Sequence, residues 1–344
     1  MERPTRVLLA LLPLLLVLAG ACAAEVPAEA GLDPEADPES PLAGKADGVC
    51  PVAGPTEEQG FDRFLSNFFF GEARHAVEEP VVQPGDAFSL RARFRYGLVS
   101  KDLEEEPVEA FVRLEECGEW IFIGDAVTDD DGMVDIPFDA SLLPGPGSYE
   151  VELVVLGDIS RARGQIEVVS PGQPMVVFDI DGTLTLSDSE LTDELLGGRE
   201  AAMYEASPEV AWRYADEGYL VVYLSGRPHM LQDMSRRWLE RHGFPAGPII
   251  TTDHLFEVTG PLVEVHKVEK LEDLIDRAGV SLYYAYGNAT TDVCSYAEAG
   301  LDPAYTYIVG ENGGSACDGY AATVALDGYE EHLESLDALP AAWE

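Results

Sequence analysis

The chain has 344 residues, of which 46% are hydrophobic and 9% aromatic, so it is long and apolar enough for about two folded domains. Its formal net charge of −43 argues against nucleic acid as a partner, because an acidic surface repels phosphate backbones. Any anionic substrate must therefore be held by local cations or by a metal ion.

The N-terminus has the pattern of an export signal. Two arginines precede an apolar run over residues 7–18, and small residues follow it. Because this run is too short to span a bilayer comfortably, we expect a signal peptide over residues 1–21. The sequence Leu-Ala-Gly-Ala-Cys22 also resembles a bacterial lipobox, although Ala19 stands where Leu is usual. This resemblance implies a lipid anchor on Cys22 and a place in the bacterial cell envelope, at a membrane surface; plain secretion is the alternative.

Cysteine usage fits export. Beyond Cys22 the chain has four cysteines, which allow three pairings: Cys50, Cys117, Cys294 and Cys317. An oxidising compartment favours two disulfides, with Cys294–Cys317 as the pair closest in sequence and Cys50–Cys117 as the other. Free buried thiols are the alternative.

The composition divides the mature chain into three parts. Residues 22–56 are rich in Ala, Pro, Glu and Gly, which predicts a flexible linker. Residues 57–170 contain short runs of alternating apolar and polar residues between turn signals, which predicts an immunoglobulin-like β-sandwich. Residues 171–344 instead alternate continuous apolar runs with helical stretches, which predicts an α/β domain with a Rossmann-like parallel sheet. Ligands of such sheets bind beyond the carboxyl ends of the strands.

One motif follows the first buried strand of the α/β domain. Asp179-Ile-Asp181-Gly-Thr183 places two carboxylates at the predicted strand end. Ser225-Gly-Arg ends the next strand, Lys267 opens a later helix, and Gly-Asn288-Ala-Thr-Thr-Asp292 follows a third strand. Together these four motifs resemble, in order and spacing, those of haloacid-dehalogenase-type phosphatases with a minimal cap.

That resemblance implies a Mg²⁺-dependent phosphohydrolase. Asp179 is the expected nucleophile and Asp181 the general acid and base, while Ser225 and Lys267 compensate phosphoryl oxygens. The implied Mg²⁺ ligands are Asp179, the Asp181 main-chain carbonyl, Asn288 and Asp292. We assign Thr183, Gly226 and Arg227 to substrate binding. As alternatives, Ser225 could only cap a helix, and Lys270 could replace Lys267.

A closer resemblance covers roughly residues 80–310. Residues 218–230, with Trp238-Leu, His242-Gly-Phe-Pro and Gly247, look like the C-terminal domain of membrane-associated phosphatidylinositol transfer proteins of the retinal-degeneration-B type. The same domain is catalytic in the lipins, which are phosphatidate phosphatases. The transfer-protein domain lacks the first Asp and only binds phosphatidate. Both Asp179 and Asp181 are present here, as in the lipins, which favours catalysis.

Three hypotheses follow for the function. The first is a phosphomonoesterase for phosphatidate or a related lipid phosphate, with Arg236 and Arg237 contacting the head group or the membrane surface. The second is a phosphatidate-binding module without turnover. The third is a phosphatase for soluble small-molecule or protein phosphates. For Arg236 and Arg237, pairing with acidic neighbours is the alternative role.

Overall fold

The computed structural model describes residues 50–63, 66, 71–97, 101–187, 200–252 and 261–343. All of them belong to one compact unit, Val49–Glu344. The expected signal peptide and Cys22 lie outside the described residues. Within the described ranges, no helix has the length and apolar character needed to cross a bilayer.

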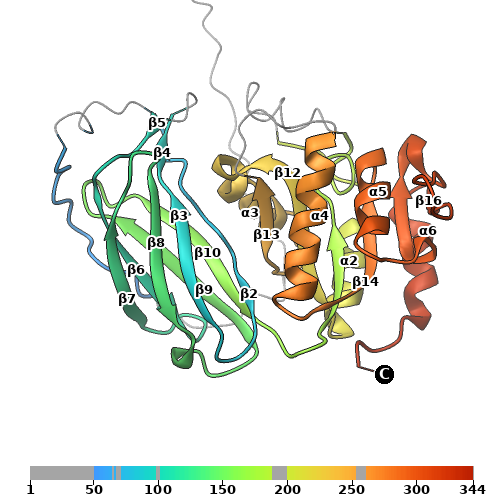
Figure 1. Ribbon diagram of the computed structural model, residues 1–344, viewed down its shortest axis with the longest axis horizontal. Coiled ribbons are helices and arrows are strands. Elements are labelled where there is room, and N and C mark those ends of the chain that lie inside the picture. The colour runs from blue at the N-terminus through green and yellow to red at the C-terminus, as the bar shows by residue number, and fades with distance from the viewer. Residues whose placement is uncertain are drawn as a thin grey trace, which may run out of the picture. The chain divides into compact units, whose positions relative to one another are not determined.

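The first half of this unit is a β-sandwich (Figure 1). Buried and exposed residues alternate along its strands because only one face of each sheet is buried. In β8 (Met133–Asp139), for example, every second side chain is buried. The smaller sheet has the order β1-β3-β8, with β1 Ala76–Val77 and β3 Ala87–Arg93. The larger has the order β2-β10-β9-β6-β7: Val81–Val82, Arg161–Val168, Gly147–Val155, Pro107–Arg113 and Trp120–Val127. A hairpin of β4 (Arg95–Tyr96) and β5 (Lys101–Asp102) and the short helix η2 (Ala140–Leu142) complete this domain.

The second half is an α/β domain on a six-stranded parallel sheet, as predicted from the sequence. Its order is β13-β12-β11-β14-β15-β16: Ile249–Thr252, Leu220–Pro228, Pro174–Phe178, Ser281–Gly287, Thr306–Val309 and Val324–Leu326. Every residue of β11 is buried, because helices cover both faces of the sheet. From β11 the chain moves to β12 and β13 on one side and then returns to β14 on the other. This reversal places a topological switch point beside β11.

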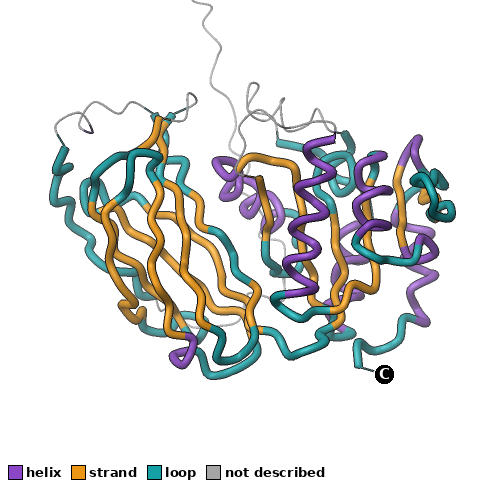
Figure 2. Tube along the Cα trace, in the orientation of Figure 1, coloured by secondary structure: helices purple, strands orange, loops and turns teal. Residues whose placement is uncertain are grey.

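Helices lie on both faces of this sheet (Figure 2). Apolar residues of α2 (Ser207–Asp216), α3 (Gln232–Arg241) and α6 (Tyr329–Ser335) pack with one face of β11 and β12. Those of α4 (Pro261–Asp276) and α5 (Thr290–Glu298) pack with the other face. The described residues of the domain also form four short 3₁₀ helices: η3 His229–Leu231, η4 Pro303–Tyr305, η5 Gly310–Asn312 and η6 Leu336–Ala338.

Glu79 of the sandwich joins the edge strand of the parallel sheet. Its carboxylate accepts a hydrogen bond from the Ile249 backbone N–H at 2.6 Å and pairs with Arg236 of α3. The Glu79 side chain is fully buried, so this contact satisfies a backbone donor that an edge strand otherwise leaves free. Burial raises the pKa of Glu79, and the neighbouring Arg236 opposes that rise.

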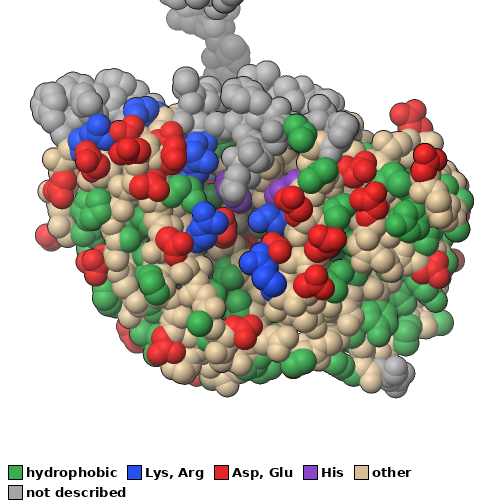
Figure 3. All heavy atoms as spheres, viewed as in Figure 1, with side chains coloured by type: hydrophobic (Ala, Val, Ile, Leu, Met, Phe, Trp, Pro, Cys, Tyr) green, Lys and Arg blue, Asp and Glu red, His purple; other side chains and the backbone are tan. Residues whose placement is uncertain are grey.

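Charge is unevenly spread over the molecular surface. On the face shown in Figure 3, Asp and Glu side chains are scattered over both domains, whereas Lys, Arg and His side chains lie in the middle and at the upper left of the view, with acidic side chains among them.

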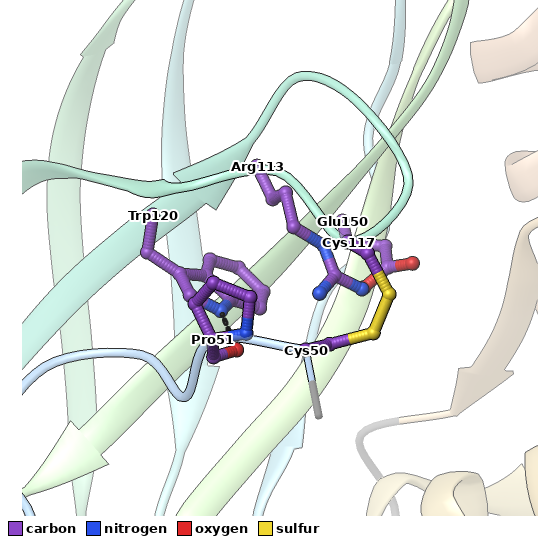
Figure 4. The surroundings of a disulfide bond; sticks show 6 residues. All are labelled: Cys50, Pro51, Arg113, Cys117, Trp120 and Glu150. Atoms are coloured by element: carbon purple, nitrogen blue, oxygen red, sulfur yellow. Dashed lines mark hydrogen bonds and ion pairs between the residues drawn. A yellow bond between two sulfur atoms is a disulfide. The ribbon is translucent and has the colours of Figure 1, made fainter. Parts of the chain in front are cut away.

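The last residues of the predicted linker are fastened to the sandwich. A disulfide joins Cys50 to Cys117, and the Trp120 indole N–H donates to the Pro51 carbonyl at 3.0 Å (Figure 4). Arg161 donates to the carbonyls of Ala53 and Pro55. The expected linker over residues 22–56 is therefore too long at its C-terminal end, because these anchors hold residues 50–55 in place.

Candidate active site

Asp179 lies directly beyond β11, at the carboxyl end of the most central strand. Its backbone N–H donates to the Tyr286 carbonyl at 3.0 Å, which continues the pairing with β14. The following turn needs Gly182, whose φ is +72°, and the backbone N–H groups of Leu184 and Thr185 both bond to the Ile180 carbonyl. This tight loop fixes the directions of both carboxylates of the motif.

Lys267 bridges the two most deeply buried carboxylates of the site. Its Nζ donates to Asp179 Oδ1 at 2.6 Å and to Asp292 Oδ1 at 2.5 Å, and all three side chains are at most 5% exposed. The other oxygen of Asp179 accepts from Thr183 Oγ1 at 2.9 Å. The sequence predicted that Lys267 opens its helix, and this prediction is wrong. Helix α4 begins six residues earlier, at Pro261, and Lys267 projects from its second turn.

Asp292 is held at the N-terminus of α5. Its Oδ2 accepts the backbone N–H groups of Asn288 and Ala289, each at 3.0 Å. Its side chain packs against Gly287, where an added Cβ would come within 2.4 Å of the Asp292 Cβ, so only glycine fits. The Asn288 amide oxygen lies 3.4 Å from Thr183 Oγ1, which brings it to the second oxygen of Asp179.

Asp181 is held by a different cation. The Arg227 guanidinium donates from Nε to Asp181 Oδ2 at 2.9 Å and from its second terminal nitrogen to Oδ1 at 2.7 Å, a fork-shaped contact. Arg227 is 1% exposed and also donates to Ser235 Oγ at 2.8 Å. The Asp181 side chain remains 21% exposed, so it can still reach a ligand. Arg227, which we assigned to substrate binding, therefore contacts a catalytic candidate.

Residues 225–227 leave the regular pairing of β12 with β13. The register shifts between Leu224 and Pro228, which bulges the intervening residues out of the ladder. The bulge lets buried Ser225 donate to Asp181 Oδ2 at 3.2 Å while its Oγ accepts the Arg227 backbone N–H. Gly226 lies between them, and a Cβ added there would come within 3.3 Å of Val263 Cγ1, so the Val263 side chain would have to shift by a few tenths of an ångström.

The site carries one negative charge in excess, because three carboxylates face two cations. Burial, with the charges of Asp292 and Asp181, raises the pKa of Asp179 to about 7, and Lys267 opposes this rise. For Lys267, burial acts to lower the pKa, but the carboxylates of Asp179 and Asp292 outweigh it and raise the pKa well above its usual value. Lys267 therefore stays charged.

The donor set fits a hard divalent cation. The predicted ligands are all oxygens, and the excess negative charge of the site attracts a cation. Among the described residues no cluster of three or more His, Cys, Asp or Glu side chains forms a metal cage. Mg²⁺ needs no such cage, because it keeps several waters and uses one or two carboxylates.

The two remaining arginine candidates make their ion pairs elsewhere. Arg236 pairs with Glu79 of the sandwich, and Arg237 pairs with Asp233, one turn earlier on α3. Their role at a lipid head group stays a prediction, and these contacts correspond to the alternative that we weighed. The second predicted disulfide, between Cys294 and Cys317, is present and fastens α5 to the loop before β16.

Three supporting residues were not predicted. Tyr329 of α6 is fully buried, and its hydroxyl donates to the Thr183 carbonyl at 3.0 Å. The Asn312 side chain donates to the Asn288 carbonyl at 2.8 Å, and Ser235 holds Arg227. Nothing in their local sequence marks them, because Tyr329 and Asn312 act through contacts with residues distant in the chain, and the contact of Ser235 depends on the direction of the Arg227 side chain.

Two domain families match this arrangement. Residues 73–168 match the β-sandwich domain of PITM 1-3, and residues 176–310 match the LNS2 domain of PITM 1-3. The chain carries a PITM-type β-sandwich followed by an LNS2 domain. The second match spans the site from β11 to β15 and includes all of the predicted active-site residues.

Curated relatives align across both domains. Protein retinal degeneration B from Drosophila melanogaster is 34% identical over 269 residues, which are 78% of this chain. Membrane-associated phosphatidylinositol transfer protein 1 from Rattus norvegicus is 34% identical over 270 residues, and protein 2 from Homo sapiens is 32% identical over 266, each covering 77% of this chain. The aligned part is only 19–20% of each relative's length.

Proposed function

We propose that the LNS2 domain is a Mg²⁺-dependent phosphomonoesterase with Asp179 as its nucleophile. The observation that carries this proposal is the separate fixing of two carboxylates: Lys267 and Thr183 hold Asp179, and Arg227 holds Asp181. A nucleophile and a general acid that act on the same phosphoryl group need such fixed and different positions.

The chain's own residues supply the steps of the reaction. An Asp179 oxygen forms a bond to phosphorus as the bond from phosphorus to the alcohol oxygen breaks, and Asp181 gives that oxygen a proton. A water molecule then attacks phosphorus, Asp181 takes its proton, and the bond to Asp179 breaks to release phosphate. The Lys267 ammonium, buried at the Asp179 carboxylate, compensates the charge of the phosphoryl oxygens.

Asp179, the Asp181 carbonyl, Asn288 and Asp292 would hold the Mg²⁺ ion. Bound there, the ion would neutralise the mutual repulsion between an anionic ester and the attacking carboxylate. This assignment agrees with the oxygen-only donor set and with the excess negative charge of the site.

For the substrate we propose phosphatidate or a related lipid phosphate. The names of the relatives from Rattus norvegicus and Homo sapiens describe membrane-associated phosphatidylinositol transfer proteins, which supports a lipid ligand for the shared domains. The presence of Asp179 and Asp181 together, as in the lipins, supports turnover over binding alone. An acylated Cys22 would keep the domain at a membrane; mass spectrometry of the mature N-terminus tests this, and an unmodified terminus would mean plain secretion.

A hydrolysis panel tests the proposal. Purified protein is assayed for phosphate release from phosphatidate in mixed micelles and from small phosphate esters, with and without Mg²⁺. We expect Mg²⁺-dependent release that follows the surface concentration of phosphatidate. Binding of phosphatidate without release from any ester would identify a binding module instead, and faster release from soluble esters without surface dependence would remove the lipid assignment.

A further inference from the structure

A cavity of about 530 Å³ lies between the sandwich and the LNS2 domain. Residues 78–82 and 86–89 of the sandwich form one wall, and β13 with one face of α4 forms the other. The α4 residues are Lys270, Asp273, Leu274 and Arg277, spaced by three and four positions, so the cavity follows the helix for two turns. Its volume lies in the range of small-molecule sites.

The cavity starts at the edge of the sheet that carries the active site. His229, which lines it, comes two residues after Arg227, the partner of Asp181. Thr251, also in the lining, belongs to the carboxyl end of β13, and its hydroxyl lies 2.5 Å from His229 Nδ1. Lys270 follows Lys267 on α4 by one turn. The lining and its walls therefore contain close chain neighbours of Arg227 and Lys267, the two cations that contact the catalytic carboxylates.

Both walls offer apolar surface. Val81, Val82 and Phe88 contribute from the sandwich, and Ile249, Ile250 and Leu274 contribute from the LNS2 domain. An apolar chain placed between them would be shielded from water on both of its sides. This burial would stabilise binding by about 0.8 kcal/mol for each CH₂ group. Neither domain forms this space alone, so the sandwich has a direct role in it.

Most charges in the polar part of the lining are paired. Four carboxylates and three Lys or Arg side chains line the cavity, and Glu79, Glu78 and Asp273 pair with Arg236, Arg91 and Arg277. Lys270 makes no ion pair within the described part of the chain. Gln232 is 2% exposed and lines the cavity, yet its Oε1 has no hydrogen-bond partner there. A buried acceptor without a partner points to a ligand that brings a donor, such as a glycerol hydroxyl or a bound water.

We propose that this cavity holds an apolar chain of the lipid-phosphate substrate while the phosphate lies at Asp179. The inference rests on the proposed function and deepens it, since it assigns the β-sandwich a part in choosing lipid over soluble phosphates. A soluble ester would use the catalytic carboxylates and leave the cavity to water.

Filling the cavity tests the proposal. We compare Val81→Trp with Val127→Trp, a matched control because Val127 is 63% exposed on β7 and does not line the cavity. The measured quantity is the ratio of kcat/KM for long-chain to short-chain phosphatidate. We expect the ratio to fall about 10-fold in Val81→Trp and to stay at the wild-type value in Val127→Trp. An unchanged ratio in a folded Val81→Trp protein would overturn the proposal.

A second measurement depends neither on the folding of Val81→Trp nor on turnover. Phosphatidate with a photoreactive group in its acyl chain is bound to the Asp179→Asn protein and irradiated. We expect labelled peptides from residues 78–89, 249–251 or 270–277. Labels elsewhere would overturn the cavity assignment even if the enzyme hydrolyses phosphatidate. Labels in these peptides, with no hydrolysis by the wild type, would instead remove the proposed activity and keep the chain-binding site.

Discussion

Two groups of buried charged side chains differ in their balance. At the contact between the domains, Glu79 is held by one cation, Arg236, and by the backbone N–H of Ile249, and both oppose the rise in its pKa that burial causes. In the active site three carboxylates meet two cations, and the pKa of Asp179 rises to about 7 because burial and its acidic neighbours outweigh Lys267. A buried pair of one carboxylate and one cation has no net charge and is typical of a structural contact. A buried group with an excess negative charge is instead typical of a site that binds a cation.

The largest expected effect is on turnover in Asp179→Asn. We expect the loss of about four or more orders of magnitude in kcat, because no neighbouring group replaces covalent attack. We also expect no loss of thermal stability, since the substitution removes the excess negative charge. Phosphate-release assays and thermal unfolding measure the two effects. Near-normal turnover would remove Asp179 from the mechanism, and a large fall in Tm would show that the carboxylate serves the fold.

Removal of divalent metal should have the next largest effect. Chelation should stop hydrolysis without unfolding the protein, because the parallel sheet and its two layers of helices supply the core. Added Mg²⁺ should restore activity, and Ca²⁺ should do so poorly, since it is larger and looser in geometry. Activity and circular dichroism are measured on the same sample. Full activity after exhaustive chelation would contradict the metal assignment.

Glu79→Ala tests the buried contact between the two domains. It leaves the Ile249 N–H and the Arg236 guanidinium without their partner, so we expect the free energy of unfolding to fall by about 3 kcal/mol. Glu78→Ala is the matched control: Glu78 is part-exposed, its pair with Arg91 is 3.4 Å long, and we expect a change within about 1 kcal/mol. Equal unfolding midpoints of the two variants in urea would refute a structural role for the Glu79 contact.

Substitutions of Arg227 distinguish two roles for this residue, the positioning of Asp181 and the binding of substrate. If it positions Asp181, Arg227→Lys should lower kcat about 10-fold and Arg227→Ala about 100-fold, with KM for a small phosphate ester little changed. If it binds substrate, as we expected from the sequence, KM should rise instead. Steady-state kinetics of both variants separate these outcomes, and the partial rescue by Lys is absent if Arg227 only fills space.

The smallest effect is expected at Arg237. Arg237→Ala should change unfolding by no more than about 0.5 kcal/mol, because its pair with Asp233 is an exposed contact within one helix. Arg236→Ala should cost more, since it leaves buried Glu79 unpaired. If Arg237→Ala, at normal stability, loses more activity on phosphatidate than on a small phosphate ester, the head-group prediction for Arg237 stands, and equal loss on both substrates would contradict it.

Local sequence patterns predicted much of this fold. A continuous apolar run followed by Asp179-Ile-Asp181 indicates a strand buried on both faces with carboxylates at its end, and β11 has that form. Strands β8 and β10 were not individually predicted. The burial of β10 depends on pairing with β9 and β2, and such partners are not visible in a short window.

The active site could be predicted in its members but not in their contacts. The motifs indicate Asp179, Lys267 and Asp292, which lie together as expected. The fork from Arg227 to Asp181 depends on a bulge at the end of β12, and the pairing of Arg236 depends on Glu79, which lies 157 residues away in the chain. Neither the bulge nor the docking of the sandwich leaves a signal in residues 225–237.

Quenched turnover tests the central claim most directly. Wild-type protein and Asp181→Asn are mixed with phosphatidate and Mg²⁺, quenched in acid and digested, and the peptide that contains Asp179 is weighed by mass spectrometry. We expect a phosphoryl group on Asp179, in larger amount in Asp181→Asn, because Asp181 accepts the proton of the hydrolytic water. An unmodified Asp179 peptide from both proteins, while the wild type releases phosphate, would contradict the account.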